Sequence, residues 1–85
     1  MKWGLAIASR PKRQLRRMSS QERNDIDRAF SEMCDNPFFG DVKFLKGLGG
    51  TLRKRVGDWR ILFELNLENK LIFVTSIKRR GSHTY

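Results

Sequence analysis

Four cationic side chains lie close together in the segment 51–60, which reads TLRKRVGDWR. Its Gly-Asp pair is typical of a tight hairpin turn, so we expect a β-strand on each side of it. Side chains two residues apart on a strand share a face, which groups Arg53 with Arg55 and, after the turn, predicts Arg60 on the same exposed side. A guanidinium group binds phosphate through a planar fork of donors. The segment therefore predicts a phosphate-binding surface.

The other face of the same hairpin is apolar. Alternation places Lys54 on this face, together with six apolar side chains, namely Leu52, Val56, Trp59, Ile61, Phe63 and Leu65. An 85-residue chain has to use most of its apolar side chains in one core. We therefore expect this face to be buried and the arginine face to be open.

A strand and a basic helix are expected at the start of the chain. Residues 2–8 are short, apolar and followed by Ser-Arg-Pro, which is typical of a strand. Pro11 suits the first turn of a helix, because a missing N–H costs nothing there, and this helix continues to Met18. Its cationic side chains form either a solvated face or a contact with an acidic partner. They are Lys12, Arg13, Arg16 and Arg17.

A second, amphipathic helix follows. Ser19 and Glu22 fit a capping box, in which each side chain accepts a hydrogen bond from the other residue's backbone N–H. Apolar side chains then recur at the spacing of one helix face. They are Ile26, Ala29, Phe30, Met33 and Cys34. The sequence Asp-Asn-Pro ends the helix, and the position of Cys34 on the apolar stripe favours a core role over a reactive thiol.

A loop precedes the hairpin and a final strand follows it. Residues 37–50 contain four glycines and no steady period, which predicts a loop with apolar anchors; Lys43 and Lys46 in this loop either line a groove or are solvated. Residues 70–77 are rich in β-formers, and Lys78-Arg79-Arg80 extends this strand into solvent. The polar residues 81–85 form a short tail. The order β-α-α-β-β-β predicts a single α+β domain, residues 1–85, with two helices on one face of a curved antiparallel sheet.

Composition limits the class of protein. The chain has 18 basic and 9 acidic residues and a net charge of +9 at pH 7, which favours polyanionic partners. One cysteine and the lack of Cys/His clusters with zinc-ligand spacing predict neither a metal nor a cofactor, and they fit a reducing cytoplasm. The apolar start of the chain is shorter than the core of a signal peptide, and no stretch resembles a membrane span. No membrane partner is therefore expected.

The order and spacing of these segments resemble the RelE/ParE superfamily of bacterial toxins. The resemblance covers nearly the whole chain: the first strand, the helix pair, the Asn-Pro helix stop, DVKFLKGLGG, RVGDWRILFEL and the ending IKRRGSHTY. It implies the RelE-like fold and the toxin of a toxin-antitoxin system. It further implies an endoribonuclease (messenger RNA interferase) that cleaves messenger RNA in the ribosomal A site and that a cognate antitoxin holds inactive.

The resemblance also implies catalytic roles. Arg60 matches the family's strand arginine, which binds phosphate and stabilises transition-state charge. Arg80 matches a C-terminal arginine with a general-acid or charge-stabilising role. Tyr85 matches a C-terminal tyrosine that acts as general base or stacks on the substrate base. His83 is a further candidate for the base or the acid, since some related toxins use a histidine near the C-terminus; a histidine in a polar tail is otherwise a solvated residue.

Substrate binding is assigned to four cations. The resemblance implies that Arg53 and Arg55 bind the phosphate backbone. Arg79 would take the place of the neighbouring arginine if the last strand slips by one residue, and Lys46 would line the groove.

Two other functions fit the same basic chain. A ParE-like toxin would poison DNA gyrase without nuclease activity, and a small RNA-binding protein would have no toxicity. Retention of the full set of arginines together with a terminal tyrosine favours the nuclease.

Overall fold

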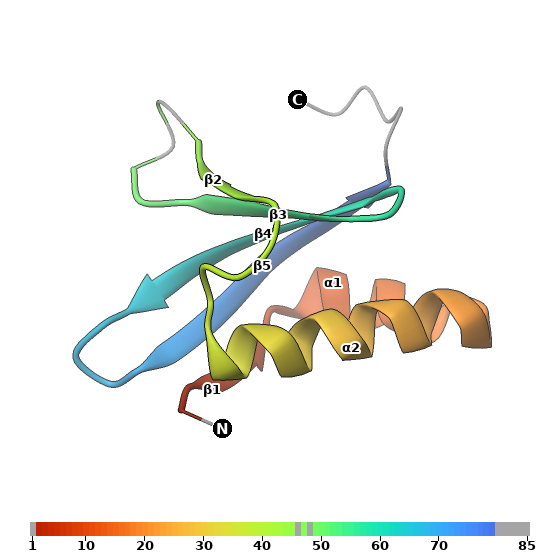
Figure 1. Cartoon of the computed structure of the whole chain (residues 1–85). Coiled ribbons are helices and arrows are strands. Elements are labelled where there is room, and N and C mark those ends of the chain that lie inside the picture. Colours follow the sequence, from red (N-terminus) through yellow and green to blue (C-terminus); the bar gives the residue numbers. More distant parts are fainter. Residues whose placement is uncertain (1, 46, 48, 80–85) are drawn as a thin grey trace.

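The computed structural model describes residues 2–45, 47 and 49–79, which form two helices and five strands (Figure 1). In chain order these elements are β1 (Gly4–Ile7), α1 (Ser9–Arg16), α2 (Ser20–Asp35), β2 (Val42–Phe44), β3 (Leu52–Val56), β4 (Trp59–Asn66) and β5 (Leu71–Arg79). Neither helix in this part of the chain is long and apolar enough to cross a lipid bilayer.

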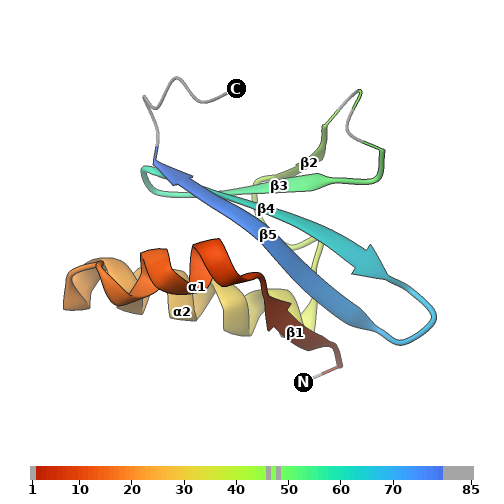
Figure 2. The ribbon, with the colours of Figure 1, turned by 180° about the vertical axis from the view of Figure 1, so that it is seen from behind.

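The strands form one sheet in the order β1-β5-β4-β3-β2. The pairs β2–β3, β3–β4 and β4–β5 are antiparallel, whereas β1 lies parallel to β5. Both helices lie on the same face of the curved sheet (Figures 1 and 2). The opposite face, which no helix of the described residues covers, is called the open face below. The predicted α+β fold, with two helices on one face of a sheet, is confirmed.

Two details of the predicted sheet were wrong. The sheet is mixed, because β1 pairs with β5 in the parallel direction. Parallel pairing needs a long connection, and both helices and three strands lie between these two strands in the chain. The segment 37–50, predicted to be a loop throughout, contains β2, which pairs with β3. A strand of three residues is too short to show a period in the sequence.

The hydrophobic core lies between the helices and the sheet. Ile26 and Met33 of α2 pack with Ile61 and Phe63 of β4, and all four are fully buried. The six apolar side chains predicted for the hairpin face all lie in this cluster or against it. The turn between β3 and β4 depends on Gly57, whose φ of 56° is the positive value that a two-residue hairpin loop requires at its first central position.

The predicted capping box begins α2. The Ser19 hydroxyl accepts a hydrogen bond from the Glu22 backbone N–H at 3.2 Å, and the Glu22 carboxylate accepts one from the Ser19 backbone N–H at 3.0 Å. The hydrogen bond from the Ser19 backbone lowers the pKa of Glu22. The same carboxylate also pairs with the guanidinium of Arg79. The start of α2 is therefore tied to the end of β5.

Replacing Ser19 with alanine is expected to lower the free energy of unfolding by about 1 kcal/mol, because a backbone N–H in the first turn of α2 loses its acceptor. Urea-induced unfolding followed by circular dichroism measures this change. Ser20→Ala is the matched control, since the Ser20 side chain makes no hydrogen bond among the described residues. Equal losses in the two variants would contradict the capping role.

A β-bulge decides which side chains of β5 face the core. The pairing with β4 shifts by one residue in this region, so Thr75 has no residue directly opposite it on β4 and its hydroxyl donates to the Leu62 carbonyl oxygen at 3.3 Å. As a result Val74 and Ile77, three residues apart, both face the helices and are buried. Beyond the bulge, alternation puts Arg79 on the helix side and Lys78 on the open face.

Candidate functional site

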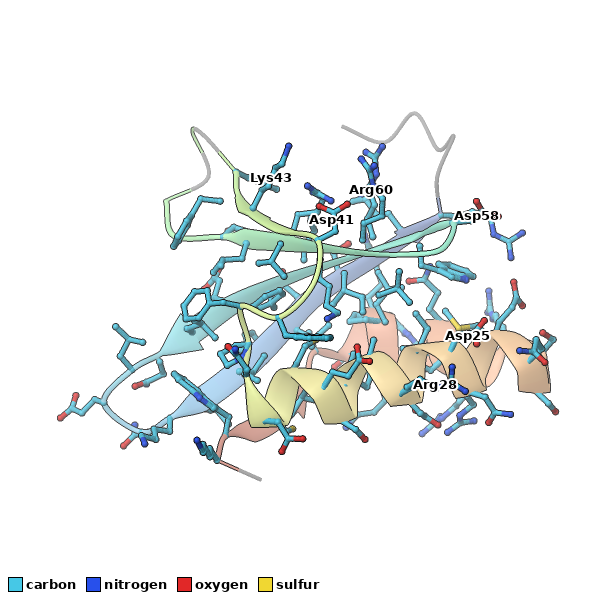
Figure 3. All side chains as sticks on the ribbon, viewed as in Figure 1. Asp25, Arg28, Asp41, Lys43, Asp58 and Arg60 are labelled. Carbon is cyan, nitrogen blue, oxygen red and sulfur yellow. The ribbon has the colours of Figure 1, made fainter. Side chains whose placement is uncertain are left out.

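Three cationic side chains form a row across the open face. Arg55 on β3 lies directly opposite Arg60 on β4, and Arg60 lies directly opposite Lys78 on β5. Neighbouring strands are about 4.8 Å apart, so the row spans about 10 Å. Figure 3 shows Arg60 pointing away from the helices. Arg55, Arg60 and Lys78 are called the cationic row below.

The members of the cationic row repel one another across the strands. Like charges directly opposite each other on neighbouring strands are destabilising, and Arg60 has a cation opposite it on both sides. Departures from what favours the fold are expected at functional sites. The row is therefore interpreted as a site for an anion.

Asp41 holds the two arginines of β3. One of its carboxylate oxygens is 3.4 Å from Nη2 of Arg53, and the other is 3.8 Å from Nε of Arg55. The Arg55 backbone N–H also donates to the Asp41 carbonyl oxygen at 3.0 Å. Because one negative charge is shared between two positive ones, the open face keeps a positive charge around Asp41.

Arg53 is more buried than the sequence predicted. Its side chain is 9% exposed, whereas that of Arg55 is 45% exposed. Its Nη1 atom is buried and has no hydrogen-bond partner among the described residues, which is a rare and costly state for a polar atom. The expectation of an exposed Arg53 was wrong, and Arg55 is the accessible arginine of this strand.

Two lysines of the site were not settled by the sequence, which left Lys43 either lining a groove or solvated and gave Lys78 no role at the site. Lys43 on β2 lies directly opposite Arg53, and Figure 3 shows it on the same side of the sheet as Asp41 and Arg60. Recognising the strand at residues 42–44 would have placed Lys43 by alternation. Lys78 could not be placed from local sequence, because its side of the sheet depends on the bulge in β5.

Arg79 does not join the cationic row. Its guanidinium lies 4.7 Å from the ring centre of Trp59, which is opposite it on β4, and pairs with Glu22 of α2. These contacts are on the helix side of the sheet. The geometry therefore gives Arg79 a role in joining β5 to α2, and its expected role in substrate binding stays a prediction.

The other predicted site residues lie outside the described part of the chain. They are Lys46 in the loop before β3 and, after β5, Arg80, His83 and Tyr85. Their roles remain predictions.

Lys54 is a buried cation on the helix side, as alternation predicted. Its Nζ donates to the Phe39 carbonyl oxygen at 2.8 Å and lies 3.5 Å from a carboxylate oxygen of Glu32. The Phe39 ring centre is 5.3 Å away. A buried charge has to be paired or hydrogen-bonded, and these contacts meet that need. Lys54 thus fastens the segment after α2 to β3.

Cys34 is also a structural residue. The side chain is buried, and burial raises the pKa of its thiol, which disfavours the reactive thiolate. In residues 2–45, 47 and 49–79, no three His, Cys, Asp or Glu side chains are grouped closely enough to hold a metal ion.

Comparison with solved structures identifies the fold. The RelE-RelB complex from the archaeon Pyrococcus horikoshii superposes with a TM-score of 0.82 and 23% identity, over 95% of this chain and 98% of that one. The RelBE2 toxin-antitoxin complex of Mycobacterium tuberculosis gives 0.81 and 18%, over 94% and 100%. The isolated Escherichia coli RelE toxin gives 0.80 and 18%, over 96% and 88%. No protein-family model and no curated sequence matches the chain.

Proposed function

We propose, on the premise that this chain has the RelE fold, that it is the toxin of a toxin-antitoxin system and cleaves messenger RNA on the ribosome. The observation that supports this function best is the cationic row. Its three charges cross the open face of the sheet, in the place where a phosphodiester could lie against them. The resemblance of the sequence to RelE toxins assigns Arg60, the middle of the row, to the scissile phosphate.

The proposed reaction needs no group beyond the RNA and the protein. The 2′-oxygen of the ribose attacks the adjacent phosphorus as a base removes its proton, and the bond from phosphorus to the 5′-oxygen breaks as an acid protonates that oxygen. The products are a 2′,3′-cyclic phosphate and a 5′-hydroxyl end. Charge builds up on the phosphoryl oxygens in the transition state, and positioned cations stabilise it.

The residues divide this work by their protonation chemistry. Arginine stays protonated in proteins, so Arg55 and Arg60 supply charge and hydrogen-bond donors but cannot serve as the base. In this proposal the base is His83 or Tyr85 of the tail and the acid is His83 where Tyr85 is the base. Arg80 stabilises the charge on the leaving 5′-oxygen, because it stays protonated as the other arginines do. Arg53, beneath the accessible surface, keeps Asp41 and the neighbouring strand in position.

An antitoxin is the proposed protein partner. Several of the matching solved structures are RelE-RelB complexes, and a chain of net charge +9 steers an acidic segment toward itself. We expect such a segment to neutralise the open face or to displace the C-terminal tail. The proposal places the protein in the cytoplasm, where messenger RNA is translated. The gyrase alternative is not favoured, because the solved structures compared here are RelE proteins.

The deciding experiment is induced expression in bacteria followed by primer extension on translated messages. The proposal expects growth arrest and new 5′ ends within the coding region. The purified protein should cut messages on ribosomes and leave 2′,3′-cyclic phosphate ends. Growth arrest with intact messages and gyrase-dependent DNA breaks would instead establish the gyrase poison. Unaffected growth would point to an RNA-binding protein without toxicity.

Asp41→Asn is expected to strengthen RNA binding roughly fivefold, because removing one charge near the row is worth about 1 kcal/mol. Binding is measured with single-stranded RNA carrying 2′-O-methyl groups, which lacks the attacking hydroxyl and is not cleaved. Asp27→Asn removes the same charge from an exposed position of α2 that has no ion pair among the described residues. Equal effects of the two changes would show that net charge alone controls affinity.

A further inference from the structure

A second cationic surface lies between α1 and β5. A groove of about 590 Å³ separates these elements, and five cations line it. They are Arg10, Arg13 and Arg17 at α1, and Lys78 and Arg79 on β5. We call it the α1–β5 groove.

The groove exists because β1 is short. Pairing of β1 with β5 ends at Ile7 and Val74. At residues 76–78, the edge of β5 that faces away from β4 therefore has no strand beside it among the described residues. After β1 the chain turns into α1, which begins at Ser9 and packs against β5 beyond the end of this pairing. The space that a further strand would fill is left as the groove.

The helix side of the groove has no neutralising charge of its own. Arg10, Arg13 and Arg17 are spaced three and four residues apart and so share one helix face, and α1 contains no acidic residue. None of these three side chains has a hydrogen bond or an ion pair within the described residues. By contrast, both arginines of β3 form ion pairs with Asp41, and Arg79 forms one with Glu22. The α1 side of the groove is therefore a positive surface without a compensating carboxylate among the described residues.

The groove is continuous with the cationic row. Lys78 belongs to both, since it lines the groove and lies directly opposite Arg60. A polyanion bound at Arg60 could therefore continue past Lys78 toward α1 without crossing a negative side chain of the row or of α1.

The lining of the groove fits nucleic acid better than a protein segment. A peptide that folds on binding has to bury apolar side chains to offset its loss of entropy. The large apolar residues exposed in this structure lie elsewhere, at Phe38, Phe39, Phe44, Leu67 and Phe73. The one large apolar residue of the groove, Ile77, is buried in the core and only 2% exposed, so it offers no surface to a peptide. Charge without apolar anchors is the pattern expected for phosphate contacts.

The geometry points to a second RNA-binding site: the α1–β5 groove holds phosphates of the single strand that is cleaved at the cationic row. The inference rests on the proposed function for its choice of RNA. It assigns Arg13 and Arg17 to flanking phosphates, so these residues set affinity for a long strand and take no part in bond cleavage.

The test compares two double variants of the same helix. Arg13→Gln with Arg17→Gln removes two charges from the groove, whereas Lys12→Gln with Arg16→Gln removes two from exposed positions of α1 that do not line it. Glutamine has nearly the helix propensity of arginine and lysine, so both variants should keep the circular dichroism spectrum of the parent. Fluorescence anisotropy with a single-stranded 2′-O-methyl RNA is measured over a range of salt concentrations.

The slope of log K against log salt is expected to become about 1.4 less steep in the groove variant, which is about 0.7 for each lost phosphate contact. The control variant should keep the parent slope. Equal slopes in the two variants would overturn the proposed RNA-binding site in the groove, because net charge alone would then explain the affinity. An unchanged RNA slope with lost binding to polyglutamate would overturn RNA in favour of an acidic protein, and an effect seen only with duplex RNA would overturn the single strand. Because the probe cannot be cleaved, RNA binding in the groove can be measured even if the protein does not cut messages. The experiment therefore tests the groove independently of the proposed nuclease function.

Discussion

Arg60→Ala is expected to reduce the rate of messenger RNA cleavage by a factor of about 10² to 10³. This loss is typical when one positioned donor to a developing negative charge is removed. Arg60 is the central cation of the row, with Arg55 and Lys78 opposite it on either side. Its removal leaves the phosphoryl oxygens without the nearest proposed donor, and single-turnover cleavage on programmed ribosomes measures the rate.

The fold should tolerate this change. Removing the middle of three like charges relieves cross-strand repulsion, so we expect the free energy of unfolding to change by no more than about 1 kcal/mol. Arg60→Lys keeps the charge but loses the planar fork, and we expect an intermediate rate. Arg23→Ala, which removes an arginine from an exposed position of α2, is the control and should cleave like the parent. Cleavage by Arg60→Ala at the parent rate would contradict the proposal that the cationic row is the active site.

Phe63→Ala is expected to lower the free energy of unfolding by about 3 to 5 kcal/mol. The Phe63 ring is fully buried between the sheet and the helices, and its loss removes apolar burial and leaves a cavity. A domain of 85 residues is typically stable by about 4 to 13 kcal/mol. The change would therefore remove a large part of the stability, and urea unfolding or thermal melting would detect it.

Phe73→Ala is the matched control for the core. Phe73 lies on β5 next to the buried Val74, but its side chain is on the other side of the strand and is 41% exposed. The same chemical deletion should therefore cost less than half as much there, because little buried surface is lost. Similar losses at the two positions would mean that the helices do not cover the face on which Phe63 lies.

These expectations divide the sheet into two faces with different tasks. Side chains toward the helices supply the core, and side chains on the open face supply charge. Arg79 and Lys78 illustrate the division, because they are neighbours in sequence yet one binds Glu22 of α2 and the other lies opposite Arg60. Variants on the open face should accordingly change RNA binding or cleavage with little effect on stability, and variants on the other face should do the reverse.

Local patterns in the sequence predicted several elements correctly. The capping box at Ser19 depends on residues three apart, the apolar stripe of α2 on the helical period, and the turn at Gly57 on a backbone conformation that glycine favours. Alternation within β3 and β4 also placed Arg55 and Arg60 on one face, because a hairpin fixes the register of its own two strands. The resemblance to RelE toxins likewise led to the fold that the solved structures confirm.

The sequence by itself thus determined the two helices, the hairpin and the arginine face, since each depends on residues that are near one another along the chain. Only the tertiary structure decided the parallel pairing of β1, the burial of Arg53 beside Asp41 and the bulge at Thr75, which puts Lys78 rather than Arg79 on the open face. These features depend on contacts between segments distant in sequence, where a shift of one residue moves a side chain to the other face of the sheet. The α1–β5 groove has the same origin, because it forms where one strand ends beside a longer one.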